Sequence, residues 1–147
     1  FSSPGRLQIV NREPLTILDA AHNEDGARSL VGAMRESFGA PYAVAVVSIL
    51  AEKNARALLE ILDDTFVEFI ITQSESARAI PAETLAELAR EVFGGDRVHV
   101  QANPQWALAE AAKLLPPTLG SAIVVTGSVT LVGQVLKLKQ IEAEQDA

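Results

Sequence analysis

Two side chains that could do chemistry, Asp19 and His22, stand three residues apart directly after the apolar run Leu15–Leu18. The small residues Ala20 and Ala21 lie between them and would let another group approach closely. A carboxylate at this point could accept hydrogen bonds from both hydroxyls of a ribose, and an imidazole could donate to a phosphate or a carboxylate. The alternative is that Asp19 only caps a turn and that His22 is an exposed loop residue, and the spacing alone supports both readings about equally.

Other positions could bind an anion. Arg6 and Lys53 are isolated cations beside expected corners of the chain, the loops next to the ends of strands. An isolated surface cation is more often simply solvated. Gly127 and Ser128 follow a buried-type strand and would offer backbone N–H groups and a hydroxyl at the start of a helix. Taken alone, Ser128 is more simply explained as an ordinary helix N-cap.

Several common kinds of site are missing from the sequence. It contains neither Gly-x-x-x-x-Gly-Lys-Ser/Thr nor a Gly-x-Gly-x-x-Gly after the first strand, so we expect no phosphate-binding loop and no dinucleotide fingerprint. It has no cysteine and only two histidines, His22 and His99, which argues against a metal site. We interpret His99, in the middle of an expected strand, as a packing or surface residue.

The composition is that of a globular domain: 48% of the 147 residues are hydrophobic and 21% are charged. The formal net charge of -7 argues against nucleic acid as a partner. No apolar run is long enough to span a membrane, and the lack of cysteine fits a cytoplasmic protein. The chain starts at Phe1 in a linker-like stretch, so we expect one domain, residues 1–147, of a longer protein.

Strand and helix patterns alternate along the chain. Asn23 is the expected N-cap of the first helix, Gly39 and Pro41 its end, and Pro81 the first residue of another helix. The expected strands are at residues 7–10, 15–18, 42–50, 67–72, 97–101 and 122–126, and the helices at residues 23–38, 53–63, 81–93, 104–115 and from 129 into a frayed acidic tail at 142–147.

This order predicts an α/β fold of Rossmann-like type. The expected sheet has six strands, mostly parallel, with an antiparallel edge strand and helices on both faces. In such a sheet a ligand binds outside the carboxyl ends of the strands, which is where Asp19 and Ser128 fall.

Five motifs occur together, in one order, from Pro4 to about Val135. They are Pro4-Gly5-Arg6, Leu18-Asp19-Ala20-Ala21-His22-Asn23, Glu52-Lys53-Asn54, Ser76-Ala77-Arg78-Ala79 and Val125-Thr126-Gly127-Ser128. With these motifs the chain resembles the C-terminal domain of bacterial folylpolyglutamate synthase/dihydrofolate synthase, a family of the Mur ligase group. The Asp-x-Ala-His-Asn motif is the most specific part of the resemblance.

The resemblance implies an ATP-dependent ligase. In that family ATP phosphorylates a pteroate or folate carboxylate, and the amine of L-glutamate then attacks the acyl phosphate. The P-loop and most Mg²⁺ ligands belong to a larger N-terminal domain, which is absent from this chain, so the chain alone is expected to be inactive. The C-terminal domain closes over that domain and over ATP.

The resemblance also implies roles for individual residues. Arg6 would bind near the ATP phosphates, Asp19 would bind the ribose, and His22 would be the catalytic residue near the phosphate or the glutamate. The weaker candidates for glutamate binding are Asn23, Lys53, Arg78 and Ser128.

The sequence departs from the family pattern at four positions. Glu24 replaces a usual proline, and Glu52 and Asn54 replace aspartates beside Lys53, which puts the role of that loop in question. Ser48 stands where glycine is frequent and is expected to narrow the approach to the cleft.

A second hypothesis is a non-catalytic, doubly wound α/β module that binds a small ligand or a protein through the same corners. A P-loop domain encoded upstream of Phe1 would favour the ligase. The sequence does not separate dihydrofolate synthesis from polyglutamate extension. We expect a monomer.

Overall fold

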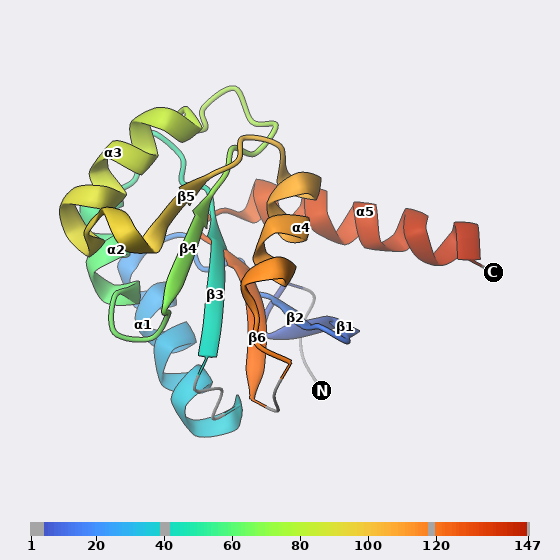
Figure 1. Ribbon diagram of the computed structural model, residues 1–147. Helices are drawn as coiled ribbons and strands as arrows, with labels where there is room; N and C mark the ends of the chain where they lie inside the picture. Colours follow the sequence, from blue (N-terminus) through green and yellow to red (C-terminus); the bar gives the residue numbers. More distant parts are fainter. Residues whose placement is uncertain (1–4, 39–41, 118–119, 147) are drawn as a thin grey trace.

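The centre of the fold is a six-stranded sheet, which Figure 1 shows between two layers of helices. The computed structural model describes residues 5–38, 42–117 and 120–146. The strand order is β1-β2-β6-β3-β4-β5. All neighbouring pairs are parallel except β1 with β2. The strands are β1 (Gln8–Arg12), β2 (Leu15–Leu18), β3 (Tyr42–Val47), β4 (Glu68–Ile71), β5 (Val98–Val100) and β6 (Ser121–Thr126).

The antiparallel hairpin at the sheet edge is confirmed. β1 pairs with β2 in a register that places Ile9 opposite Ile17, with an irregularity between Ile9 and Asn11. The first strand begins at Gln8 rather than at Leu7, because Leu7 has a φ of +48°, which no strand residue adopts.

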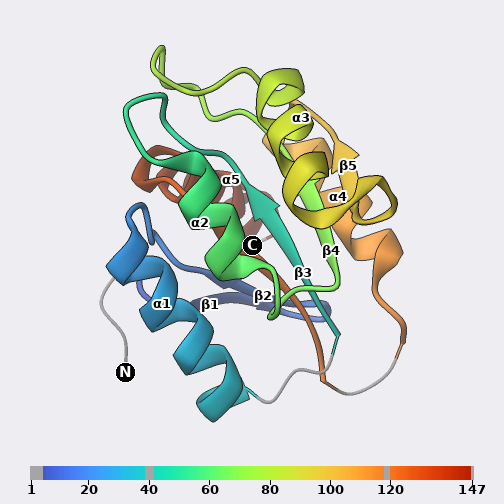
Figure 2. The ribbon, with the colours of Figure 1, turned by 90° about the vertical axis from the view of Figure 1, so that its left-hand side faces the viewer.

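The helices divide between the two faces of the sheet. Figure 2 shows α1 (Glu24–Ala33), α2 (Ala55–Leu62) and α3 (Ala82–Phe93) in front of the sheet, while α4 (Pro104–Leu114) and α5 (Val129–Asp146) lie behind it. The carboxyl-terminal half of α5 extends beyond the sheet in Figure 1. The sequence-based fold class is therefore confirmed.

Alternation along the central strands builds a core on each face. On β3, Ala43, Ala45 and Val47 pack against the layer of α1, α2 and α3. Val44 and Val46 face the other way and pack with residues of α4 and α5. Because both faces are covered, the strand is apolar throughout, and this explains the unbroken apolar run in the sequence.

Some element boundaries differ from the sequence-based expectation. The strand expected at residues 42–50 ends at Val47, because its partners end level with it, at Ile71 on β4 and Thr126 on β6. Further on, Leu50 makes only an isolated antiparallel bridge with Ala79.

Three helix ends also differ. Pro81 is the N-cap of α3 and not its first residue, because its ψ of 138° is not helical. The N–H of Ala82, the first residue of the helix, donates to the Gln73 side chain at 2.9 Å. The tail expected to fray is helical to Asp146, in a stretch rich in Glu, Gln and Ala. The first helix passes into a π-helical turn, Met34–Phe38, while the expected stop at Gly39 and Pro41 lies outside the described residues.

Candidate functional site

Polar residues gather where the parallel strands end. Buried Asp19, Ser48, Thr72, Thr126 and Ser128 all stand at or just after the carboxyl end of a strand. At this edge β2 continues into α1 on one face of the sheet, whereas its neighbour β6 continues into α5 on the other face. In open α/β sheets, ligands bind at the carboxyl ends of strands near such a point, where neighbouring strands continue to opposite faces.

Backbone hydrogen bonds join the corner after β2 to the corner after β6. The N–H of Asp19 donates to the carbonyl of Val125, and the N–H of Gly127 donates to the carbonyl of Ala21, each at 3.0 Å. Gly127 has a φ of +105°, and a Cβ there would lie 2.4 Å from the carbonyl oxygen of Ser48. This close approach requires glycine and fixes three strand ends against one another.

Asp19 is almost completely buried, with 5% of its surface exposed. Its Oδ1 accepts from the N–H of Ala21 at 3.0 Å and its Oδ2 from the N–H of Leu7 at 3.2 Å. Burial raises the pKa of the Asp19 carboxyl above 3.8, while the two N–H donors and the charge of Arg6 act in the opposite direction. Asp19 therefore does cap the turn, as the simpler reading of the sequence expected.

The same carboxylate also lines a cavity of about 400 Å³ beside the start of α1. Arg6, Asp19, His22 and Asn23 all contribute to its wall, so the structure brings together these four candidate residues. His22 Nδ1 lies 3.0 Å from the carbonyl oxygen of Ala20. Since a carbonyl oxygen can only accept, Nδ1 carries the proton and donates it, and a neutral ring then offers Nε2 as an acceptor.

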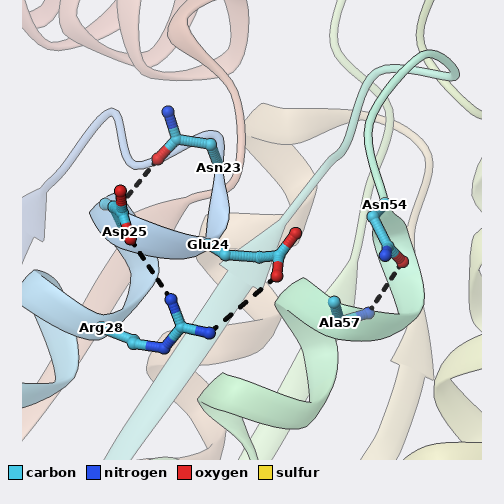
Figure 3. A network of polar contacts seen from close by, with 7 residues as sticks. Asn23, Glu24, Asp25, Arg28, Asn54 and Ala57 are labelled. Atoms are coloured by element: carbon cyan, nitrogen blue, oxygen red, sulfur yellow. Dashed lines mark hydrogen bonds and ion pairs between the residues drawn. The ribbon is translucent and has the colours of Figure 1, made fainter.

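Helices α1 and α2 begin side by side at this edge, as the close-up in Figure 3 shows. Asn23 Oδ1 accepts from the N–H of Gly26 at 2.8 Å, and Asn54 Oδ1 accepts in the same way from Ala57 at 3.2 Å. The expected N-cap role of Asn23 is confirmed, and it occupies the oxygen of the side chain. The Asn23 amide NH₂ group and the second lone pair of Oδ1 are then the groups suited to a ligand.

Lys53 and Arg78 lie together in a different corner. The loops that carry them pair through the N–H of Ala51 and the carbonyl of Arg78, at 2.8 Å. The Arg78 guanidinium forms an exposed ion pair with Glu52. Neither Lys53 nor Arg78 lines the cavity next to Asp19.

Ser128 and Ser48 are fully buried. The Ser128 hydroxyl accepts from the N–H of Leu131 at 3.1 Å and so caps α5, and Ser128 does not line the cavity. Ser48 Oγ accepts from the N–H of Ser74 at 3.0 Å. Ser48 therefore joins two loops and does not line the cavity.

The sequence reading did not identify several residues of this site. Asp25 and Ser29 line the cavity from α1, at the four-residue spacing that places side chains on one helix face. That spacing could have indicated them. The contact of Leu7 with Asp19 had no sequence signal, because it joins residues twelve positions apart.

His99 lies on β5 away from this site, with Nε2 2.8 Å from a carboxylate oxygen of Glu68 and 37% of its side chain exposed. It is a surface histidine, as expected. Within residues 5–38, 42–117 and 120–146, no group of three or more acidic or histidine side chains could hold a metal ion. None of the described helices has the length and apolar character needed to cross a membrane.

The sheet order and the cavity lined by Arg6, Asp19 and His22 define a doubly wound α/β domain with a polar site at the carboxyl end of β2. Residues 5–129 match the family described as "Mur ligase, glutamate ligase domain". The chain belongs to this family.

Known proteins are similar to this chain both in sequence and in fold. The dihydrofolate synthase/folylpolyglutamate synthase of Mycobacterium tuberculosis is 36% identical over 143 residues, which cover 90% of this chain and 29% of the relative. A solved structure of Mycobacterium tuberculosis folylpolyglutamate synthase with ADP and AMPPCP has a TM-score of 0.90 at 35% identity and covers 94% of this chain and 32% of that one. The chain thus spans less than a third of the length of these relatives.

A third structure is a bifunctional folylpolyglutamate synthase/dihydrofolate synthase with Mn, AMPPNP and L-glutamate bound. Its TM-score is 0.75 at 27% identity, over 93% of this chain and 32% of that one.

Proposed function

We propose that this chain is the C-terminal domain of an ATP-dependent ligase that adds L-glutamate to a folate or pteroate carboxylate. The observation that carries the proposal is the single cavity that gathers Arg6, Asp19 and His22 at the strand ends of a Mur ligase domain. Relatives with this fold have been solved with ADP, AMPPCP and L-glutamate. The domain would close over an upstream ATPase domain of the same protein.

The reaction proceeds in two steps. A carboxylate oxygen of the folate attacks the γ-phosphorus of ATP and ADP leaves, which gives an acyl phosphate. The amine nitrogen of glutamate then attacks the acyl carbon, inorganic phosphate leaves, and the nitrogen loses a proton. Each step moves negative charge between oxygens, so a cation and hydrogen-bond donors near the phosphate lower the barrier.

Three residues of the cavity have a part in this scheme. Arg6 is exposed, and its guanidinium can neutralise the ATP phosphates. Asp19 is fixed by two N–H donors and offers its remaining lone pairs to the ribose hydroxyls. His22 lines the same cavity and acts near the transferred phosphate or the incoming glutamate.

The metal ion would come with the nucleotide. The described residues contain no cluster that could hold one, so Mg²⁺ would be bound by ATP and by the upstream domain. A relative solved with Mn and AMPPNP supports a divalent metal in the intact ligase.

Lys53, Arg78, Asn23 and Ser128 remain our candidates for the glutamate side of the reaction. Of these, Lys53 is the half-buried cation of its loop, whereas Ser128 would act through the start of α5 and not through its buried hydroxyl. We also propose that the intact ligase is a cytoplasmic monomer.

The test replaces Arg6, Asp19 and His22 singly by alanine in the full-length ligase. We expect Asp19→Ala and Arg6→Ala to raise the apparent KM for ATP about ten- to a hundred-fold, since each removes a charged hydrogen bond. His22→Ala should act mainly on kcat, because its ring lies near the phosphate only in the closed enzyme. Steady-state kinetics with ATP and with glutamate varied separately measure both effects.

The matched control is His99→Ala, a histidine on the far strand with no part in the cavity. It should leave both KM values unchanged. If the three cavity variants behaved like this control, the cavity would not be the nucleotide site.

A further inference from the structure

The backbone on both sides of Arg6 is hydrogen-bonded to the corner after β2. The carbonyl of Gly5 accepts from the N–H of Ala20 at 2.6 Å, and the N–H of Leu7 donates to Asp19 Oδ2 at 3.2 Å. Arg6 is therefore the middle residue of a three-residue segment whose two ends are attached to Asp19 and Ala20. Its side chain is exposed, but its Cα is fixed beside the cavity.

This segment has an unusual backbone. Gly5 has a φ of +77° and Leu7 a φ of +48°, and the second value is unfavourable for a leucine. Gly5 is buried, and a Cβ on it would meet Ala20 at 3.6 Å and Val132 of α5 at 3.7 Å. Such a conformation persists only where surrounding contacts enforce it.

One further side chain enforces it. Gln8, the half-buried first residue of β1, accepts a hydrogen bond through Oε1 from the N–H of Gly5 at 2.9 Å. This bond closes the turn formed by Gly5, Arg6 and Leu7 on itself. Without it, the N–H of Gly5 would lose its side-chain acceptor.

We propose that Gln8 is a positioning residue that presents Arg6 to the phosphates of ATP. The proposal rests on the proposed function, because it assumes that Arg6 binds the nucleotide. Gln8 does not line the cavity and acts only through the backbone of Gly5, Arg6 and Leu7. Its loss would let the guanidinium sample many positions and so lower its effective concentration at the phosphate.

The first experiment compares three variants of the full-length ligase. Gln8→Ala removes the acceptor, Gln8→Glu keeps an oxygen at the same place, and Gln140→Ala changes an exposed glutamine on α5 as the control. One neutral hydrogen bond corresponds to about a three- to ten-fold change in affinity. We therefore expect Gln8→Ala to raise the KM for ATP by about that factor, with the KM for glutamate and the melting temperature almost unchanged. Gln8→Glu should restore the KM for ATP, and Gln140→Ala should have no effect.

The second experiment asks whether Gln8 acts through Arg6. In an Arg6→Ala background, adding Gln8→Ala should raise the KM for ATP no further, because the group that Gln8 positions is already gone. Hydrogen exchange of the full-length protein should show faster exchange of the Gly5 amide in Gln8→Ala and not in Gln140→Ala. The exchange measurement does not depend on activity.

The outcomes separate the two proposals. If Arg6→Ala raises the KM for ATP but Gln8→Ala does not, the positioning role of Gln8 is overturned and the nucleotide site stands. Independent, multiplying effects in the double variant would overturn it as well. If Arg6→Ala itself leaves the KM for ATP unchanged, the assignment of Arg6 to the nucleotide fails, and the role of Gln8 fails with it.

Discussion

Asp19 combines a structural task with a proposed binding task. A carboxylate that is 5% exposed is costly to ionise, and the structure offsets part of this cost with the N–H groups of Ala21 and Leu7. The same two bonds place the carboxylate at the wall of the cavity. One residue therefore shapes the turn, attaches the segment around Arg6 and faces the site.

The raised pKa of Asp19 predicts a pH dependence of stability. Between 3.8 and the higher pKa of the folded state, the folded chain binds more protons at Asp19 than the unfolded chain, so the free energy of unfolding falls as the pH rises through this window. Asp19→Asn removes this dependence. Urea unfolding from pH 3.5 to 7 should therefore show the wild type losing stability relative to Asp19→Asn as the pH rises, with a constant difference above the window.

The opposite trend would mean that the two N–H donors and the charge of Arg6 outweigh burial at Asp19. The matched control is Asp25→Asn in the first turn of α1, where the Asp25 side chain is 98% exposed. Asp25→Asn and the wild type should differ in their free energy of unfolding by about the same amount at every pH of this range.

At the scale of elements, Arg97 joins α2, β4 and α3 from the short turn before β5. Its guanidinium donates to the Asp63 carboxylate at 2.6 Å, to the Asp63 carbonyl at 2.8 Å and to the Phe66 carbonyl at 2.6 Å. It also lies over the stacked rings of Phe69 and Phe93, 5.3 and 5.4 Å from their centroids. A planar group with several donors is needed for all these contacts, and lysine cannot make them together.

We expect Arg97→Lys to lower the free energy of unfolding by about 1–3 kcal/mol, because the part-buried carbonyl groups of Asp63 and Phe66 lose their donors. Arg56→Lys is the control, since Arg56 makes one exposed ion pair with Glu91, and it should cost less than about 1 kcal/mol. Urea titrations followed by circular dichroism measure both. Equal effects of the two substitutions would make Arg97 an ordinary surface cation.

Fluorescence of Trp106 is a poor probe of unfolding, because this residue is already 63% exposed in the folded chain.

At the scale of the whole molecule, the proposed function requires that the cavity of this chain forms one wall of a larger site. The cavity is open beside α1, and the sequence has no phosphate-binding loop. ATP bound only to Arg6, Asp19 and His22 would have its phosphates largely in water, where electrostatic stabilisation of a transition state is weak.

The isolated chain should therefore neither hydrolyse ATP nor form an amide. Phosphate release and glutamate incorporation, measured with the purified chain at saturating ATP, should equal the buffer background. The full-length ligase assayed in parallel is the positive control. Steady ATP turnover by the purified chain that persists through further purification would contradict the proposal that catalysis also needs the upstream ATPase domain.

The sequence by itself determined the types and the order of the elements, because apolar periodicity and capping residues act over a few neighbours. The apolar run from Tyr42 predicts a strand covered on both faces, and Asn23 predicts the start of α1, and both are found. The Asp19–His22 corner could be located in the same way, since a strand end and a helix start lie next to each other in the chain.

Only the tertiary structure decided which candidate side chains meet. Arg6 reaches the cavity because Leu7 takes a positive φ and donates to Asp19, a contact between residues far apart in sequence. Ser128 was a weaker candidate from the sequence, and in the structure it is completely buried and caps α5. Lys53 lies in another loop, which the N–H of Ala51 joins to the loop of Arg78. Such choices depend on long-range packing, which local sequence patterns do not encode.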